Sequence, residues 1–230
     1  MTNSKTTLDD HTELSRKLLR VLEDFVDEIG KRSCTAHLET VLNDGHFLKG
    51  KNLGQKPERF IEDNLIFPTL HVLDHELRPR PVQYAPRWSH GRGIPDFALT
   101  TIPISKAKQS DIRLFGESKP PNKLNYARQD METYLNKDLD FHAISLLTDG
   151  IEWELWIRPR NEELSDKFVP YMTASLRDAL MIVKNRNLEQ EPYNKHNARS
   201  QIDTEQFDNF THEGIVDIIH DKFELIHFDG

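Results

Sequence analysis

The feature that most constrains the fold is a pair of apolar segments joined by a tight turn near the middle of the chain. The first segment, FHAISLLT, is a continuous apolar run of the kind found in buried strands. Asp149-Gly150 supplies turn chemistry, and the next residues, IEWELWIR, alternate sides as a strand does. We expect Trp153 and Trp156 to be structural residues on opposite faces of that strand. The pattern therefore predicts a β-hairpin within a sheet.

Helical patterns flank this hairpin on both sides along the chain. Apolar residues from Leu14 to Ile29 recur at three- and four-residue steps, which predicts an amphipathic helix ending near Gly30. Pro57 opens a second helix that Pro68 must kink or interrupt. Further helices are expected over residues 124–135 and within LRDALMIVKN and HEGIVDIIHDKFELI. Residues 31–56 and 185–200 are expected to be irregular.

Two more strands, DFALTTIPI and DIRLFGESK, are predicted ahead of the hairpin and are joined by the polar loop SKAKQS. The order of elements predicts an α/β fold, in which helices flank a central mixed β-sheet of about four or five strands. We expect residues 1–56 to form an N-terminal helical segment that docks on the domain or mediates dimerisation. Residues 57–184 would form the core, and residues 185–230 a polar linker and C-terminal helix.

Composition narrows the classes of protein that fit. The chain has 230 residues, enough for one medium domain, and a formal net charge of −8, which argues against a basic nucleic-acid coat. An acidic exterior can coexist with a local basic groove, so the charge does not exclude an enzyme of DNA. Cys34 is the single cysteine, which excludes an intramolecular disulfide. No apolar run is typical of a membrane span or signal peptide, so we expect a cytoplasmic protein with no membrane partner.

The candidate chemistry lies in two short polar motifs at predicted strand ends. Glu117 and Lys119 are two residues apart on one strand, so their side chains project to the same side. Asp96 opens the preceding strand, and its carboxylate comes close to that of Glu117 if the two strands are neighbours. Facing carboxylates repel each other and favour a hard divalent cation with oxygen ligands, such as Mg²⁺. The motifs therefore predict a metal site suited to phosphodiester hydrolysis.

The pattern Pro95-Asp96 … Glu117-Ser118-Lys119 resembles the PD-(D/E)xK nuclease superfamily, in the variety found at the N-terminus of type I restriction endonuclease motor subunits and their stand-alone relatives. The resemblance spans roughly residues 57–160. It includes a helix that carries an acidic residue, here Glu62, and a helix after the strand that carries a glutamine, here Gln129. The sequence LLTDGIEWELW resembles the closing hairpin of the family.

This resemblance implies a restriction-endonuclease-like fold and hydrolysis of DNA, with a role in restriction or genome defence. It implies Mg²⁺, for which Mn²⁺ can substitute, held by Asp96, Glu117 and the backbone carbonyl of Ser118. Lys119 would orient or activate water, and Glu62 would assist with a second metal or a bridging water. Gln129 would position the substrate or Lys119.

The chain departs from the family pattern in three respects. The family glutamine is followed four residues later by tyrosine, whereas here Tyr134 follows Gln129 by five. Pro120 and Pro121 directly after Lys119 are unusual. No G-x-x-x-x-G-K-(S/T) loop is present, so the resemblance is to the nuclease module alone and not to an ATP-driven translocase.

Basic and aromatic residues beside these motifs are candidates for contact with nucleic acid. Arg87, Trp88 and Arg92 precede Asp96 in a proline-rich segment, and Lys123 and Arg128 follow Lys119. Their cations suit phosphates and the indole suits a base. The alternative is a solvated proline-rich loop whose aromatic residues cover the core.

Other interpretations stay open at this level. Asp96 can cap a turn, and Glu117 and Lys119 can form an ordinary surface ion pair. A non-catalytic nucleic-acid-binding or assembly module would keep the same fold. RNA is not excluded as the substrate, and neither is a homodimer or a partner subunit. His71 and His75 have a spacing that can bind zinc, but no third ligand is evident and we disfavour that interpretation.

Overall fold

The computed structural model describes residues 8–80, 95–137, 139–162, 169–187 and 192–225. Within these ranges, six strands form one mixed sheet in the order β1-β2-β3-β4-β5-β6. Strands β3 and β4 are parallel, and every other neighbouring pair is antiparallel. The strands are β1 Leu77–Pro79, β2 Phe97–Leu99, β3 Ile112–Ser118, β4 His142–Thr148, β5 Glu152–Arg158 and β6 Met172–Ser175.

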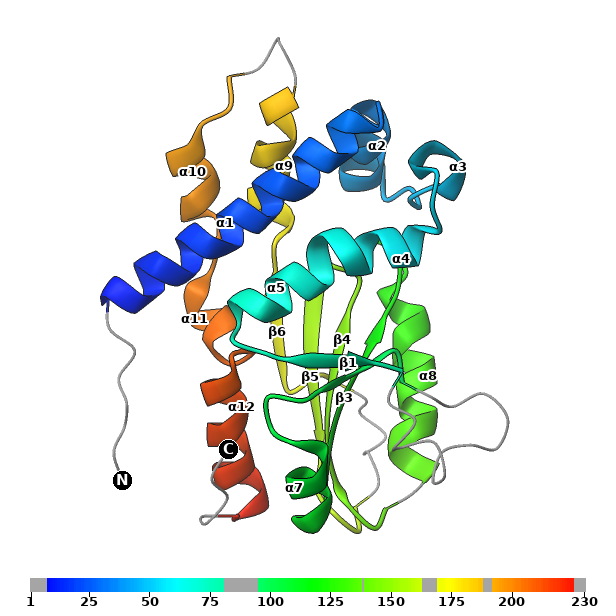
Figure 1. The fold of residues 1–230 in the computed structure, drawn as a ribbon, viewed down its shortest axis with the longest axis vertical. Coiled ribbons are helices and arrows are strands. Elements are labelled where there is room, and N and C mark those ends of the chain that lie inside the picture. Colours follow the sequence, from blue (N-terminus) through cyan, green and yellow to red (C-terminus); the bar gives the residue numbers. More distant parts are fainter. Residues whose placement is uncertain (1–7, 81–94, 138, 163–168, 188–191, 226–230) are drawn as a thin grey trace.

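Helices lie against both faces of this sheet (Figure 1). None of the described helices has the length and apolar character needed to cross a membrane. The helical elements are α1 Leu8–Lys31, α2 Thr35–Asp44, α3 Gly50–Leu53, α4 Pro57–Ile61, the π-helical turn η1 Glu62–Ile66, α5 Phe67–Val72, α7 Ile104–Gln109, α8 Leu124–Lys137, α9 Arg177–Val183, the 3₁₀ turn η3 Lys184–Asn187, α10 Lys195–Ser200, α11 Thr204–Asp208 and α12 His212–Phe223.

The two faces of the sheet bury different sets of side chains. On one face, α8 packs through Ala127 and Met131 against Phe115 and Trp156 of the strands. On the other face, Trp153 joins a larger cluster together with side chains of α1, the α4–η1–α5 segment and the C-terminal helices. The two tryptophans of β5 are thus almost fully buried on opposite faces, which confirms the structural role expected for them. The result is a sheet covered by helices on both sides.

The α/β class is confirmed, but the expected number of strands was too low. The sequence predicted about four or five strands, and the sheet has six because short β1 and β6 extend its two edges. The segment Leu77–Pro79 is too short to show alternation and contains a proline, which is tolerated at a sheet edge. Neither edge strand carries a periodic signal in the sequence.

Three segments expected to be irregular contain helices. Residues 31–56 contain α2 and α3, each followed by a left-handed glycine, Gly45 and Gly54, that ends the helix. The loop SKAKQS forms most of α7, which begins directly after Pro103. Residues 195–200 form α10, capped by the Asn194 side chain. These helices are short, so their apolar periodicity is too brief to be recognised.

The helix that begins at Pro57 is continuous but changes geometry in the middle. It is α-helical to Ile61, then makes the wider turn η1, and resumes as α5 from Phe67. Pro68 lies in the first turn of α5, where a missing N–H destabilises a helix least. The predicted interruption is therefore a π-helical turn, a feature often found at functional sites.

The N-terminal helix docks on the domain. Leu18, Leu22 and Phe25 of α1 are fully or almost fully buried, and α1 contacts η1 and α5 as well as the C-terminal helices. The ring of Phe25 lies 5.9 Å from that of Phe60 on α4. The C-terminal helices contribute Phe207 to the same hydrophobic cluster. All three predicted segments of the chain therefore share one core.

His75 belongs to the structural core and not to a metal pair with His71. Its side chain is 3% exposed, and Nε2 donates a hydrogen bond to the carbonyl of Phe210 at 2.8 Å. Nδ1 of His71 donates to the carbonyl of His75 at 3.1 Å. Burial, together with the neighbouring His212, lowers the pKa of His75 to about 4. The imidazole is therefore neutral in the folded protein near neutral pH.

This buried imidazole predicts a loss of stability in mild acid. The unfolded histidine binds a proton below its ordinary pKa, whereas the folded one resists protonation until about pH 4. The free energy of unfolding should therefore fall as the pH drops from about 6.5 towards 4, by up to about 3 kcal/mol from this group. His75→Gln keeps a donor for Phe210 but does not titrate, so it should flatten this dependence. Urea unfolding at about pH 7 and about pH 5 measures the free energy of unfolding of both proteins. An equal loss between these pH values in the native protein and in His75→Gln would contradict the assignment of the pH dependence to His75.

Candidate functional site

The candidate site lies where β2 begins and β3 ends. These strands are antiparallel, with Phe97 opposite Gly116, so Asp96 comes next to the last residues of β3. Gly116 is required at this position because the ring of Phe97 lies directly over it, in the space that any side chain would occupy. The close approach of ring and backbone fixes where β2 starts, and it therefore fixes the position of Asp96.

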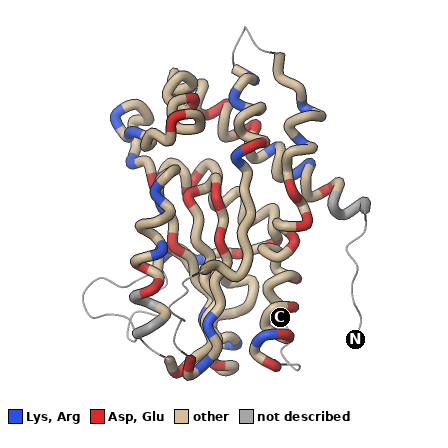
Figure 2. Tube along the Cα trace, turned by 180° about the vertical axis from the view of Figure 1, so that it is seen from behind, with Lys and Arg blue, Asp and Glu red and all other residues tan. Residues whose placement is uncertain are grey.

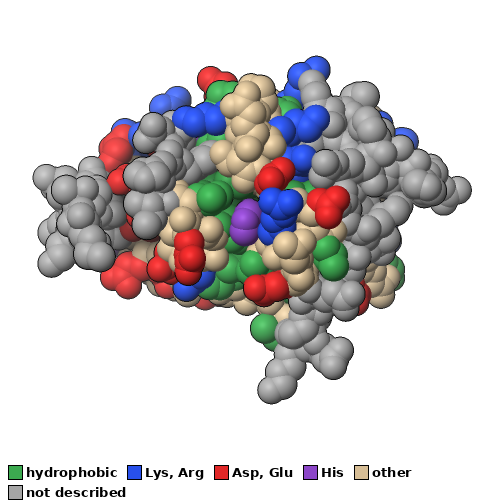
Figure 3. Space-filling view, turned by 90° about the horizontal axis from the view of Figure 1, so that it is seen from below, with side chains coloured by type: hydrophobic (Ala, Val, Ile, Leu, Met, Phe, Trp, Pro, Cys, Tyr) green, Lys and Arg blue, Asp and Glu red, His purple; other side chains and the backbone are tan. Residues whose placement is uncertain are grey.

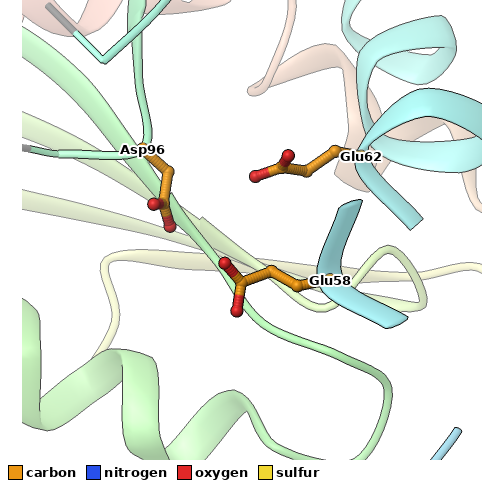
Figure 4. Close-up of side chains that lie close together, drawn as sticks. All are labelled: Glu58, Glu62 and Asp96. Carbon is orange, nitrogen blue, oxygen red and sulfur yellow. The ribbon is translucent and has the colours of Figure 1, made fainter. Parts of the chain in front are cut away.

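Three carboxylates converge in front of these strands. Glu58 of α4 and Glu62 of η1 face Asp96, and Figure 4 shows their carboxylates directed towards a common space. One oxygen from each residue lies within 4.8 Å of the others. Glu62 is 9% exposed, whereas Glu58 and Asp96 are partly buried. Glu58 and Glu62 are four residues apart, so one helical face presents both to the strand end.

Ser118 joins two of these carboxylates to the end of β3. Its backbone N–H donates to Asp96 Oδ2 at 2.9 Å. Its hydroxyl donates to Glu62 Oε1 at 2.7 Å and lies 3.2 Å from Asp96 Oδ2. Because the hydroxyl has one proton, it donates to one carboxylate at a time. Ser118 therefore orders the acidic group but does not neutralise it.

Glu117 and Lys119 form a second group beside the first. Lys119 Nζ donates to Glu117 Oε1 at 2.7 Å, which confirms that these side chains project to the same side of the strand. The same ammonium lies 3.0 Å from Asp130 Oδ2 on α8. Glu117 is 5% exposed, and its other oxygen, Oε2, is buried and has no hydrogen-bond partner in the part of the chain that the structure describes. A buried carboxylate oxygen without a partner is costly, and a cation or a proton would relieve that cost.

Electrostatic repulsion acts across both groups, with Asp96 in common. Burial raises the pKa of Glu117 to about 8, and the charge on Asp96 adds to the increase. Burial likewise raises the pKa of Glu58 and of Glu62, and Asp96 again contributes to each. Burial disfavours the charged form of Lys119, but attraction to Glu117 outweighs it and raises the pKa of the ammonium. The four carboxylates of the site thus outnumber the two cations paired with them in the described residues, which are Lys119 and the more exposed Arg59, 3.3 Å from Glu62 Oε2.

The structure brings together five of the residues singled out in the sequence. Asp96, Glu62 and Ser118 are in mutual contact, and Glu117 and Lys119 adjoin them. The set predicted for the metal, Asp96 with Glu117 and the Ser118 carbonyl, stays a prediction. The carboxylates grouped by distance are Glu58, Glu62 and Asp96.

The other candidate residues make contacts outside this group or lie outside the described residues. Gln129 is exposed on α8, one residue before Asp130, which is the α8 residue paired with Lys119. Arg128 forms an ion pair with the buried carboxylate of Glu154 on β5. Lys123 lies in the turn before α8, with its ammonium 4.5 Å from the centre of the Phe47 ring. Arg87, Trp88 and Arg92 lie outside the described residues.

Sequence reasoning missed two residues of the site. Glu58 could have been found from its spacing, because a carboxylate four residues before Glu62 shares its face of the helix. Asp130 carried no such signal, because its contact with Lys119 depends on how α8 packs against the sheet.

The residues present fit a hard divalent cation. Glu58, Glu62 and Asp96 offer carboxylate oxygens, which are the ligands that Mg²⁺ and Mn²⁺ prefer. Two cations already pair with this acidic group, Lys119 with Glu117 Oε1 at 2.7 Å and Arg59 with Glu62 Oε2 at 3.3 Å, whereas Glu117 Oε2 has no hydrogen-bond partner among the described residues.

No family model, no curated protein and no solved structure matches the chain. The function is therefore inferred from the geometry of the site and from the motifs in the sequence.

Proposed function

We propose that the protein is a metal-dependent nuclease that hydrolyses phosphodiester bonds, with DNA as its substrate. The observation that carries this proposal is the convergence of Glu58, Glu62 and Asp96 beside the buried Glu117–Lys119 pair. An acidic group that binds a hard cation, adjoined by an ammonium, suits a reaction whose transition state gains negative charge. The proposal includes the restriction-endonuclease-like fold and the role in restriction or genome defence that the motifs imply.

The chain would divide the chemical work among these residues. Glu58, Glu62 and Asp96 would hold Mg²⁺, which supplies Lewis-acid stabilisation of the phosphodiester oxygens. Lys119 would place a fixed positive charge beside the scissile phosphate and orient the attacking water. Glu117 pairs with Lys119 beside the carboxylate cluster and would complete the set of metal ligands or accept a proton. Ser118 would act through its hydrogen bonds, which position Glu62 and Asp96.

The first prediction from this proposal concerns metal binding. Calorimetric titration with Mn²⁺ should show a binding site. Its affinity should fall at least about tenfold in Glu62→Gln and in Asp96→Asn. Each change keeps the shape of the side chain but removes the charge that attracts the cation.

Glu213→Gln is the matched control for this titration. Glu213 is exposed on α12, so its replacement makes the same change of charge away from the site. Equal affinity in the native protein, Glu62→Gln and Asp96→Asn would overturn the metal assignment. Carboxylate-dependent metal binding without cleavage of DNA or RNA would favour a non-catalytic binding module.

A further inference from the structure

Exposed aromatic rings and lysines gather beside the candidate active site. Among the described residues, Phe47, Tyr126 and Val169 are the exposed large hydrophobic side chains, and Phe47 and Tyr126 are 46% and 51% exposed. Lys123 connects the two residues: its ammonium lies over the Phe47 ring at 4.5 Å, and its backbone carbonyl accepts from the backbone N–H of Tyr126, three residues later, at 3.0 Å. We call Phe47, Lys123 and Tyr126 the aromatic–lysine patch.

Short links connect this patch to the catalytic strand. Lys123 follows Lys119 by four residues, across the turn closed by its N–H and the carbonyl of Pro120. Asn122 ties this turn to the segment that carries Phe47, because its side-chain amide donates to the carbonyls of Val41 and His46 at 2.9 Å. The patch is therefore held at the edge of the site by hydrogen bonds on both of its segments.

Further lysines lie close to the patch. Lys49 and Lys51 follow Phe47 closely in the chain and are exposed. Figure 2 shows basic positions on α3 and on the first part of α8, along the same side of the molecule. By contrast, a cavity of about 720 Å³ on another part of the molecule is lined by six acidic residues, which would repel a nucleic acid: Glu13, Asp74, Asp208, Glu213, Asp217 and Asp221. The opposite end of the sheet, seen in Figure 3, mixes acidic, basic and hydrophobic side chains.

Exposed rings interleaved with lysines suit an unpaired strand of nucleic acid better than a duplex. A duplex hides the faces of its bases in the stack, so its contacts with protein are mainly phosphate contacts and base edges. An unpaired strand exposes base faces that stack on aromatic side chains while lysines contact its backbone. A solvated Phe47 or Tyr126 ring gains little from a duplex and much from an unpaired base.

We propose that the aromatic–lysine patch stacks unpaired nucleobases, so that the site acts on single-stranded segments, such as flaps, overhangs or unwound ends. This inference rests on the proposed nuclease function, since it assigns the substrate class of that site. Phe47 and Tyr126 carry the stacking, and Lys123 holds the phosphate between them. The chemistry of the patch does not depend on the sugar.

Binding, measured apart from cleavage, tests this inference. Fluorescence anisotropy in Ca²⁺ would compare a short labelled oligodeoxythymidine with a duplex of the same length. Phe47→Ala and Tyr126→Ala should each weaken binding of the single strand by about 5- to 150-fold, the range expected for one stacked base. Binding of the duplex should change far less, and Phe47→Trp should retain the native affinity.

Val169→Ala is the matched control, since it removes exposed apolar surface ahead of β6, at the other end of the sheet from the patch. Circular dichroism would verify that the variants are folded. A duplex bound as tightly as the single strand, an equal loss for both probes, or binding of neither probe would each overturn the inference. Cleavage of duplex DNA that is unaffected by Phe47→Ala would overturn it and leave the nuclease proposal standing. Single-strand binding that depends on the two rings, without any cleavage, would support stacking by the patch and overturn the nuclease proposal.

Discussion

Cleavage of DNA should fall by about a thousandfold or more when Lys119 is replaced by alanine or Glu117 by glutamine. Lys119 supplies a positive charge beside the carboxylate cluster, and its ammonium is held by Glu117 and Asp130. Removing it leaves the charge that develops on the phosphate without this partner. Glu117→Gln keeps the shape of the side chain but removes its charge and its ability to accept a proton. Initial rates on plasmid and single-stranded DNA, in Mg²⁺ and in Mn²⁺, would measure the effect.

Two comparisons separate this catalytic role from a structural one. Lys222→Ala removes a partly exposed ammonium from α12 and should leave the rate unchanged. Asp130→Asn should lower the rate less than Lys119→Ala, because Asp130 acts by positioning the ammonium. Folded Lys119→Ala and Glu117→Gln proteins that cut at the native rate would remove both residues from the mechanism.

The largest loss of stability is expected from Asp149→Ala. This side chain is 1% exposed and accepts three backbone hydrogen bonds, from Ile151 at 3.0 Å, Glu152 at 2.9 Å and Asn122 at 2.8 Å. Alanine would leave three backbone donors without this acceptor, one of them buried and two partly buried. The free energy of unfolding should fall by about 3 kcal/mol or more, since each unsatisfied buried group costs about 1–3 kcal/mol.

Urea unfolding would measure this loss, with Asp149→Asn as the companion variant. Asparagine keeps one acceptor oxygen, so it should retain part of the stability that alanine loses. Burial raises the pKa of Asp149 to about 6, so a neutral side chain of the same shape is tolerated at a modest cost. Because Asn122 precedes Lys123, the alanine variant should also loosen the turn beside the patch. An alanine variant as stable as the native protein would show that the three bonds contribute little.

Elements with long patterns were predictable from the sequence, and short ones were not. The amphipathic stripe of α1 and the hairpin around Asp149-Gly150 were both recognised, because each extends over many residues with one period. Edge strand β1 has three residues and α3 has four, so neither offers a period to detect. Their existence depends on pairing with β2 and on packing against α4, which are properties of the folded chain.

The same distinction applies to the candidate site. The alternation of a strand was enough to place Glu117 and Lys119 on one side, and the contact at 2.7 Å confirms it. The detailed grouping of the carboxylates was not predictable, because it depends on the angle at which α4 and η1 cross the strand ends. The spacing of Glu58 and Glu62 indicates that they share one face of the helix, but only the folded chain brings that face to Asp96 and pairs Glu117 with Lys119.

The number of residues in the segment from Pro57 to Val72 is constrained, because a π-helical turn separates its acidic residues from part of its buried apolar face. Glu58 and Glu62 precede the wide turn or begin it, whereas the buried Leu70 follows it. Each residue of a helix turns the chain by about 100°, so inserting or deleting one residue between them would rotate the acidic face away from the strands or the apolar face out of the core. A change of length in this segment would therefore disturb the site and the core together, whereas a substitution at one of its exposed positions would disturb neither.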